Sequence, residues 1–392
     1  MTPAELRAHI PLLKTTTWLN AAASSPTPQP VFDAMTAHLR DFHERGDANF
    51  QGWMRFKVAT RERLAKFLGA SAREVAFTPN TSFGFHVIGQ MLKARGVTEV
   101  LTLETEFPST TLPFLYDGLR LRGVRMRADG TYPVEDLEAA LTQSTGAIAV
   151  SAVQFASGYR VDLERISALC KARGLTFIVN AAQGLGQVPL DVKKLGIHFL
   201  AATGHKWFMS GFGNGVLVID EAWLDSVPLP LGGWLSVEPQ EQFQTWAHAT
   251  RVDDAHGFTA TGTKFRRDAA ALEGGAGAFL GAFAVDAALA LHEAVGVENT
   301  LAHNVSLQLK LRAGLRSRGF VPNTPDDPKT LSGICVVPVS GGPLDVVRAL
   351  MKEGVSTTPR GPGVRISTHV FNDETDLERL LAAIDRIGIR PA

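Results

Sequence analysis

The residue with the clearest chemical potential is Lys206, which stands just after a short apolar run. Residues 199–202 are apolar, and Thr203, Gly204 and His205 separate them from the lysine. A lysine amine becomes a useful nucleophile when burial or a nearby cation lowers its pKa, and it then condenses with an aldehyde to form an imine. The position predicts covalent chemistry at the end of a strand. The alternative is an ordinary solvated lysine.

Asn80, Thr81 and Ser82 could together bind a phosphate. They follow the apolar run at residues 75–78 and begin an amphipathic segment. A phosphate needs several converging donors, which backbone amides at a helix N-terminus and nearby hydroxyl groups supply. The same three residues would also serve as a plain helix N-cap, so the phosphate interpretation depends on the presence of Lys206.

Arg365 is the candidate for binding a carboxylate. It lies in the sequence GVRIS, directly after a Gly- and Pro-rich turn at residues 358–363. A fixed guanidinium matches a carboxylate through two parallel hydrogen bonds, which suits the α-carboxylate of an amino acid. An ordinary surface ion pair is the alternative.

Two longer segments carry a family resemblance: residues 177–192, FIVNAAQGLGQVPLDV, and residues 199–219, FLAATGHKWFMSGFGNGVLVI. They resemble the class V aminotransferase family of fold type I pyridoxal 5'-phosphate (PLP) enzymes, which includes cysteine desulfurases, isopenicillin N epimerase and kynureninase. The resemblance implies that PLP is the cofactor and that Lys206 carries it as a Schiff base. It also implies that Lys206 acts as acid and base at the Cα of an amino-acid substrate.

The same resemblance assigns further residues to the cofactor and the substrate. The implied cofactor contacts are Asn80, Thr81, Ser82, Phe107, Gln154, Asn180, Gln183, Thr203, His205, Gly262 and Thr263. The implied substrate contacts are Arg365, Asn20 and Ala22. Thr263, in FTATGT, matches a residue that reaches the phosphate of the neighbouring subunit, so a homodimer is the expected active unit.

Two departures from the family pattern bear on the reaction. Asn180 replaces the aspartate expected beside the pyridine nitrogen. An uncharged amide stabilises a protonated ring less, which predicts slower transamination than in an Asn180→Asp variant. It also leaves open a degenerate PLP-binding module without catalysis. Residues 354–365 contain no cysteine, so we expect no persulfide-forming cysteine desulfuration, whereas aminotransferase, epimerase and β-lyase activities (at C–S or other bonds) stay open.

The alternation of short apolar runs with amphipathic stretches predicts an α/β domain with a mostly parallel sheet. The predicted strands are residues 75–78, 99–103, 147–152, 176–179, 199–202 and 215–219, with two more at 334–339 and 364–367. The resemblance implies the fold type I architecture, with a seven-stranded sheet between helices. We expect an N-terminal arm at 1–30, a large PLP-binding domain at 31–262 and a small C-terminal α/β domain at 263–392.

The composition sets further expectations. The 39 basic residues balance the 39 acidic ones, which does not suggest a nucleic-acid or membrane-surface partner. The first residues lack the pattern of a signal peptide, and no apolar stretch is long enough to cross a bilayer, so we expect a cytoplasmic protein.

Cys170 and Cys335 are too few for a zinc site of their own, and no metal is expected. We assign substrate specificity to loops at 47–56 and 231–254, whose Trp53, Trp234 and Trp246 suit either an apolar pocket or packing.

Overall fold

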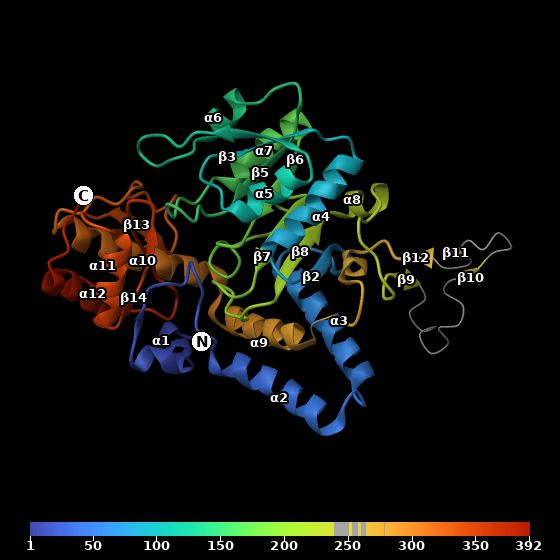
Figure 1. Ribbon diagram of the computed structural model, residues 1–392, viewed down its shortest axis with the longest axis horizontal. Coiled ribbons are helices and arrows are strands. Elements are labelled where there is room, and N and C mark those ends of the chain that lie inside the picture. The colour runs from blue at the N-terminus through green and yellow to red at the C-terminus, as the bar shows by residue number, and fades with distance from the viewer. Residues whose placement is uncertain (239–250, 253–257, 260–263, 278) are drawn as a thin grey trace.

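The computed structural model describes residues 1–238, 251–252, 258–259, 264–277 and 279–392 (Figure 1). Its centre is a seven-stranded sheet with the strand order β2-β8-β7-β6-β5-β3-β4. The strands are β2 (Val75–Thr78), β3 (Glu99–Leu103), β4 (Arg120–Val124), β5 (Thr145–Ser151), β6 (Thr176–Asn180), β7 (Phe199–Thr203) and β8 (Gly215–Ile219). Neighbouring strands are parallel except where β8 pairs with β2 and β7. The predicted α/β class with a mostly parallel sheet is confirmed.

Helices cover both faces of this sheet because its strands are apolar on both sides. In β7, Leu200 and Ala202 belong to one core, whereas Phe199 and Ala201 belong to the other, as the alternation of a strand requires. One face is covered by α4 (Thr81–Ala94), α5 (Pro108–Tyr116), α8 (Glu221–Ser226) and the short helix η4 (Ala269–Glu273). The other is covered by α3 (Phe50–Phe67), α6 (Val134–Ala139), α7 (Leu163–Arg173) and α9 (Phe279–Val295).

A smaller antiparallel sheet lies toward the C-terminus and has the strand order β13-β16-β15. Its strands are β13 (Ile334–Pro338), β15 (Thr358–Arg360) and β16 (Gly363–Ser367). The helices α10 (Val297–Arg316), α11 (Pro343–Lys352) and α12 (Glu374–Ile387) share its apolar core. This small α/β unit lies beside the large sheet in Figure 1.

The N-terminal arm joins the small unit. It consists of α1 (Pro3–Ala8), the short helix η1 (Pro11–Lys14) and β1 (Thr17–Trp18), and β1 pairs in parallel with β14 (Val355–Ser356). The chain then continues through α2 (Gln29–Arg45) to α3. Helix α9, which the sequence placed in the C-terminal domain, packs against α2 and α3 in the large unit.

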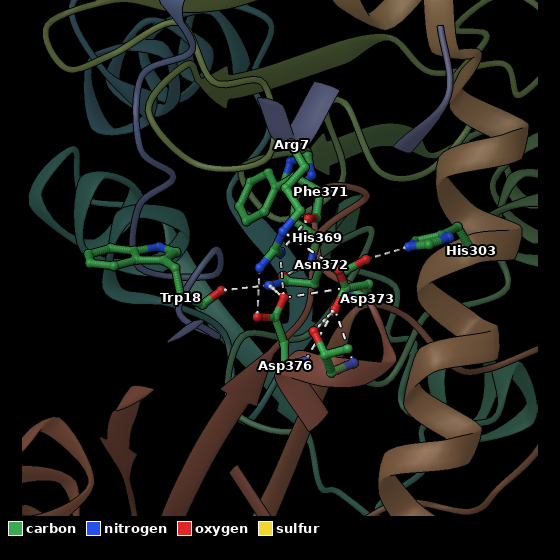
Figure 2. Close-up of polar contacts among 9 residues, drawn as sticks. Arg7, Trp18, His303, His369, Phe371, Asn372, Asp373 and Asp376 are labelled. Atoms are coloured by element: carbon green, nitrogen blue, oxygen red, sulfur yellow. Dashed lines mark hydrogen bonds and ion pairs between the residues drawn. The ribbon is translucent and has the colours of Figure 1, made fainter. Parts of the chain in front are cut away.

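A buried polar network fixes the arm to the small unit (Figure 2). Arg7 of α1 donates to the fully buried carboxylate of Asp376 (2.7 Å), which also accepts a hydrogen bond from Asn372 (2.8 Å). Asn372 accepts from the backbone of His369, and the His369 ring donates to the carbonyl of Trp207 (2.9 Å). Because Trp207 follows Lys206, the network connects the arm to the loop that carries the candidate nucleophile.

The remaining elements include the largest differences from the sequence-based expectations. Strand β4 was not predicted, because it is an edge strand in which only Val124 is buried. The prediction of a specificity loop at 47–56 is wrong. Helix α3 begins at Phe50, and the buried Trp53 on it donates a hydrogen bond to Asp41 (3.0 Å). Trp246 lies outside the described residues. Short elements complete the fold: η2 (Ala72–Glu74), β9 (Val237–Glu238), β10 (Arg251–Val252), β11 (Phe258–Thr259) and β12 (Lys264–Phe265).

No single helix in the described ranges has both the length and the apolar character needed to cross a membrane. By those two measures alone the pair α9 and α10 could do so together, with a 72° bend between them.

Candidate active site

A cavity of about 320 Å³ opens where several strands of the large sheet end. Asn180 ends β6, Thr203 ends β7 and Ser151 ends β5, so the carboxyl ends of three neighbouring strands meet there, where ligands bind in open parallel sheets. Its lining comprises Ala22, Ala23, Asn80, Thr81, Phe107, Ser109, Ser151, Phe155, Asn180, Ala182, Gln183, Thr203, His205, Lys206, Arg360 and Arg365. A larger cavity of about 710 Å³ lies between residues 224–236 and 264–271, and none of its lining residues belongs to the Lys206 site.

Lys206 reaches this cavity on a loop whose backbone leaves little freedom. A side chain on Gly204 would meet Asn214 Oδ1 at 2.0 Å and Ser210 Oγ at 2.1 Å, so this position accepts only glycine. Met209 has a φ of 60°, which is unfavourable for a residue with a side chain, and its amide donates to the carbonyl of Lys206 (3.2 Å). The fold therefore holds the lysine in place at some conformational cost.

The environment of Lys206 suits a nucleophile. Burial, and then the charges of Arg365 and Arg360, lower the pKa of the ammonium group to about 8. The amine lies 5.3 Å from the centre of the Phe107 ring. Within the described part of the chain, no carboxylate pairs with it. A substantial fraction of the amine is therefore unprotonated near neutral pH.

One end of the cavity has the donors that a phosphate requires. Asn80 caps α4 and accepts a hydrogen bond from the amide of Phe83 (3.0 Å). The hydroxyl of Thr81 is buried and has no hydrogen-bond partner among the described residues. The ring of His205 contacts the Thr203 hydroxyl (2.8 Å), and burial followed by the charge of Lys206 lowers the pKa of His205 to about 4. A buried hydroxyl without a partner, beside the amides of a helix N-terminus, fits the phosphate of PLP.

The middle of the cavity has amide groups held in fixed orientations. Asn180 donates to the hydroxyl of Thr110 (2.7 Å), and its oxygen accepts from the amide of Ala182 (2.9 Å). Gln183 accepts from the indole of Trp207 (2.7 Å) and donates to the carbonyl of Ala22 (2.9 Å). Both amides line the cavity together with Phe107, so these three side chains would contact the ring of a bound cofactor.

Arg365 lies on β16 and enters the cavity from the small unit. Arg365 is 2% exposed, and one terminal nitrogen donates to the carbonyl of Phe155 (3.2 Å). Its Nε has no hydrogen-bond partner within the ranges that the structure describes. Burial, followed by the charge of Arg360, lowers the pKa of Arg365 to about 9. No aspartate or glutamate is among the described lining residues. A buried guanidinium without an acid partner is suited to bind an incoming carboxylate.

Several predicted site residues lie outside this lining. Gln154 is fully buried and bonds with Glu106 and Thr105 instead. Ser82 donates to Ser109, which does line the cavity (3.0 Å). Asn20 forms an isolated bridge with Ser367 and accepts a hydrogen bond from Thr358, and Gly262 and Thr263 lie outside the described residues.

Six lining residues were not predicted from the sequence: Ala23, Ser109, Ser151, Phe155, Ala182 and Arg360. Arg360 and Phe155 line the cavity beside Arg365, Ser151 lines it at the end of β5, and Ser109 lines it from the first turn of α5. Arg360 stands in the Gly- and Pro-rich segment that the sequence marked only as a turn, and its position beside Arg365 became visible only through the pairing of β15 with β16.

Comparison with known proteins supports a specific family. The Aminotransferase class-V profile matches residues 17–380. The chain is 31% identical over 251 residues to a protein of Methanothermobacter thermautotrophicus named "Probable cysteine desulfurase", and the match spans 62% of either chain, less than two thirds of that relative. It is 24% identical to the isopenicillin N epimerase of Streptomyces clavuligerus, over 98% of both chains.

Two solved structures share the fold. An apo cysteine desulfurase from Thermococcus onnurineus superposes with a TM-score of 0.86 at 24% identity and covers 99% of this chain and 98% of its own. A C-DES variant with glycine covalently linked to its PLP cofactor gives a TM-score of 0.84 at 21% identity, over 96% of this chain and 98% of its own. At these identities the likeness shows the fold, which is that of the fold type I PLP enzymes.

The expectation against persulfide-forming cysteine desulfuration is wrong, because relatives of this chain are named cysteine desulfurases. That expectation rested on the lack of a cysteine in residues 354–365. The absence of one cysteine from a short segment is weaker evidence about the reaction than sequence similarity that extends over the cofactor site. Cys335 lies in β13, where burial raises the pKa of its thiol to about 11.

The match also extends well beyond the lysine loop. It begins at β1 in the N-terminal arm, passes through every strand of the large sheet and ends within α12. The chain therefore belongs to the Aminotransferase class-V family of PLP-dependent enzymes.

Proposed function

We propose that this protein is a PLP-dependent enzyme that holds an α-amino acid by its carboxylate at Arg365 and moves a proton at its Cα with Lys206. The observation that carries the proposal is that both side chains line one cavity whose described lining contains no acidic residue. An amine with a lowered pKa and an unpaired guanidinium are the two groups that such a substrate requires.

Lys206 is suited to take and return the proton at Cα. A pKa of about 8 lets the amine accept and release a proton near neutral pH. His205, the other titratable base in the described lining, has a pKa of about 4 and is a weak proton acceptor there. When bound, PLP supplies an electron-accepting ring that stabilises negative charge at Cα.

Arg365 orients the substrate for that proton transfer. The guanidinium is buried, and two parallel hydrogen bonds to a carboxylate would limit rotation of the substrate about its Cα. Phe107 and Phe155, whose ring centres lie 5.0 Å apart, help to exclude water from the same region. Water exclusion strengthens the pairing of the guanidinium with the carboxylate.

Four outcomes share this proton step: transfer of the amino group, elimination at Cβ, desulfuration with cleavage of a C–S bond, and epimerisation. The names of the relatives support the last two, and the family name supports the first. The position of Lys206 and Arg365 serves each of them equally.

We also propose that the active unit is a homodimer. Leu112, Leu115 and Tyr116 of α5 are 59%, 51% and 86% exposed, which is unusual for large apolar side chains and suits a protein contact. Light scattering should give twice the chain mass, and Leu112→Glu should reduce that mass to one chain. A wild-type protein that scatters as a single chain would contradict this part of the proposal.

Borohydride reduction tests the catalytic proposal directly. Reduction of the purified protein with bound PLP should fix the cofactor to Lys206, as peptide mass spectrometry would show, and Lys206→Ala should abolish the labelling. In a separate, unreduced sample, addition of single amino acids should change the cofactor absorbance, and mass analysis of the keto acid, the eliminated group or the opposite enantiomer would identify the reaction. A cofactor that reduction fixes at Lys206, but whose absorbance in the unreduced protein responds to no amino acid, would instead indicate a binding module without catalysis.

A further inference from the structure

Two arginines project from the same face of the small sheet into the cavity. In the antiparallel pair β15–β16, Thr358 lies opposite Arg365 and Arg360 lies opposite Gly363. Residues opposite each other share a face, and Arg360 shares the face of Thr358 because it stands two residues further along the strand. Arg360 and Arg365 are therefore diagonal neighbours, a relation in which backbone positions are about 7–8 Å apart.

No acidic residue in the described part of the chain neutralises Arg360. Its guanidinium lies over the Phe155 ring, 4.9 Å from the ring centre, and its Nε is buried without a hydrogen-bond partner. Across the described ranges no carboxylate forms an ion pair with it. Lys206, Arg360 and Arg365 line the same cavity, and the charge of Arg360 lowers the pKa of both other groups.

The phosphate of the cofactor does not account for this second arginine. The phosphate donors belong to the large sheet, where Asn80 and Thr81 follow β2 and Thr203 ends β7. Both arginines instead belong to the small sheet, on the substrate side of the cavity. An amino acid with one carboxylate would neutralise Arg365 and leave Arg360, which is half-buried, without a counter-charge in the cavity, which is unfavourable.

We propose that Arg360 binds a second carboxylate, on the side chain of the substrate, and that the enzyme therefore acts on acidic amino acids. This inference rests on the proposed function, since it assumes that Arg365 holds the α-carboxylate. Arg360 and Arg365 then form a site for a dicarboxylate, with the Phe155 ring packed beneath the outer guanidinium.

Unreactive dicarboxylates test the inference without catalysis. Calorimetric titration of the PLP-loaded protein should show that one member of the series malonate, succinate, glutarate and adipate binds at least about 10-fold more tightly than its monocarboxylate of equal chain length, because a charge-assisted pair is gained. Arg360→Gln should remove that preference and leave monocarboxylate affinity within about 2-fold. Arg360→Lys, which keeps the charge, should retain part of the preference.

Other results would overturn the inference. Equal weakening of mono- and dicarboxylates by Arg360→Gln would mean that both arginines hold the same α-carboxylate. No preference for any dicarboxylate in the wild type would exclude a second anion site. The proposed function fails separately: a protein that prefers dicarboxylates but forms no borohydride-stable link at Lys206 would contradict the catalytic proposal and leave the anion site standing.

A second inference comes from the hydrogen bonds behind Asn180. The fully buried carboxylate of Glu106 accepts hydrogen bonds from the backbone amide of Ser151 (2.7 Å), from its hydroxyl, from Gln154 (2.8 Å) and from the hydroxyl of Thr110 (3.2 Å). Burial raises the pKa of Glu106, and the four donors oppose that rise. Because the Thr110 hydroxyl donates its only proton to Glu106, it must accept from the Asn180 amide nitrogen.

These hydrogen bonds, which run from Glu106 through Thr110 to Asn180, fix which end of the Asn180 amide faces the cavity. The nitrogen points toward Thr110, and the oxygen already accepts from the backbone amide of Ala182, so two independent contacts agree on the orientation. We infer that Glu106 is a positioning residue that keeps an acceptor oxygen of Asn180 toward the cofactor ring, where it favours a protonated ring nitrogen. Position 180 has an asparagine in place of the expected aspartate, and the carboxylate of Glu106, acting through Thr110, takes over the support of the ring nitrogen.

Nuclear magnetic resonance of the protein loaded with PLP labelled with ¹⁵N at the ring nitrogen tests this arrangement. The wild type should show the chemical shift of a protonated ring nitrogen. Glu106→Gln should move it toward the unprotonated value, because the new amide can donate to Thr110 and reverse the orientation of Asn180. Thr110→Val should act in the same direction and Thr110→Ser should leave the shift unchanged. An unprotonated nitrogen in the wild type would refute the inference, and so would a shift in Glu106→Gln and Thr110→Val that is the same as in the wild type.

Discussion

The lowered pKa of Lys206 makes a quantitative prediction about how the protein captures its cofactor. The pKa is about 8, against an ordinary value of 10.5. At pH 7.5 a group with a pKa of about 8 is roughly one quarter unprotonated, whereas an ordinary lysine is unprotonated in about one molecule per thousand. The apoprotein should therefore condense with an aldehyde roughly 200-fold faster than a free lysine of equal intrinsic reactivity.

The pH dependence of PLP binding measures this pKa. Stopped-flow absorbance after mixing the apoprotein with PLP should give a rate that falls as the pH drops below about 8, because the amine then becomes protonated. Arg365→Gln should raise the apparent pKa while leaving it below 10.5, since burial is the larger cause and remains. Nα-acetyl-lysine serves as the reference amine. An apparent pKa near 10.5 in the wild type would refute the argument, and an unchanged value in Arg365→Gln would refute the contribution of that charge.

Further predictions concern the network of the arm and the two thiols. Asp376→Ala removes a fully buried carboxylate that pairs with Arg7; unfolding in urea should show a loss of about 3 kcal/mol, because the remaining charge loses its partner. Asp385→Ala, at a surface ion pair, should cost less than about 1 kcal/mol, and equal losses in both variants would contradict the role of burial. Burial raises the pKa of Cys170 to about 12 and that of Cys335 to about 11, so iodoacetamide at pH 8 should alkylate neither thiol in the folded protein and both in urea; rapid labelling of the folded chain would contradict this.

The interpretation of Asn180 from the sequence differs most from the one that the structure supports. As a residue type, asparagine predicted weak support for a protonated ring, and thus slow transamination relative to Asn180→Asp. The structure adds Thr110 and Glu106 behind it, and Glu106 precedes Asn180 by more than seventy residues in the chain. If Glu106 acts as inferred, Asn180→Asp should bring a second carboxylate next to it, and the gain in rate should be small.

The sequence alone determined the class of the protein and its central residue. Buried parallel strands need continuous apolar runs, which can be recognised in the sequence. The lysine at the strand end follows closely on a small residue, Gly204, at a crowded position, and this pattern too is visible among neighbouring residues. The helix start at Thr81 was equally readable, because a capping group lies within a few residues of the backbone amides it satisfies.

Only the tertiary structure decided which charges share the cavity. Arg360 became a neighbour of Arg365 through the register of two strands, and Glu106 came to stand behind Asn180 through the packing of α5 against the sheet. The exposed edge strand β4 carried no apolar signal, and the apolar Trp53 turned inward on a helix rather than into a substrate loop. These features depend on contacts between residues far apart in the chain, and the types and spacing of neighbouring residues do not encode them.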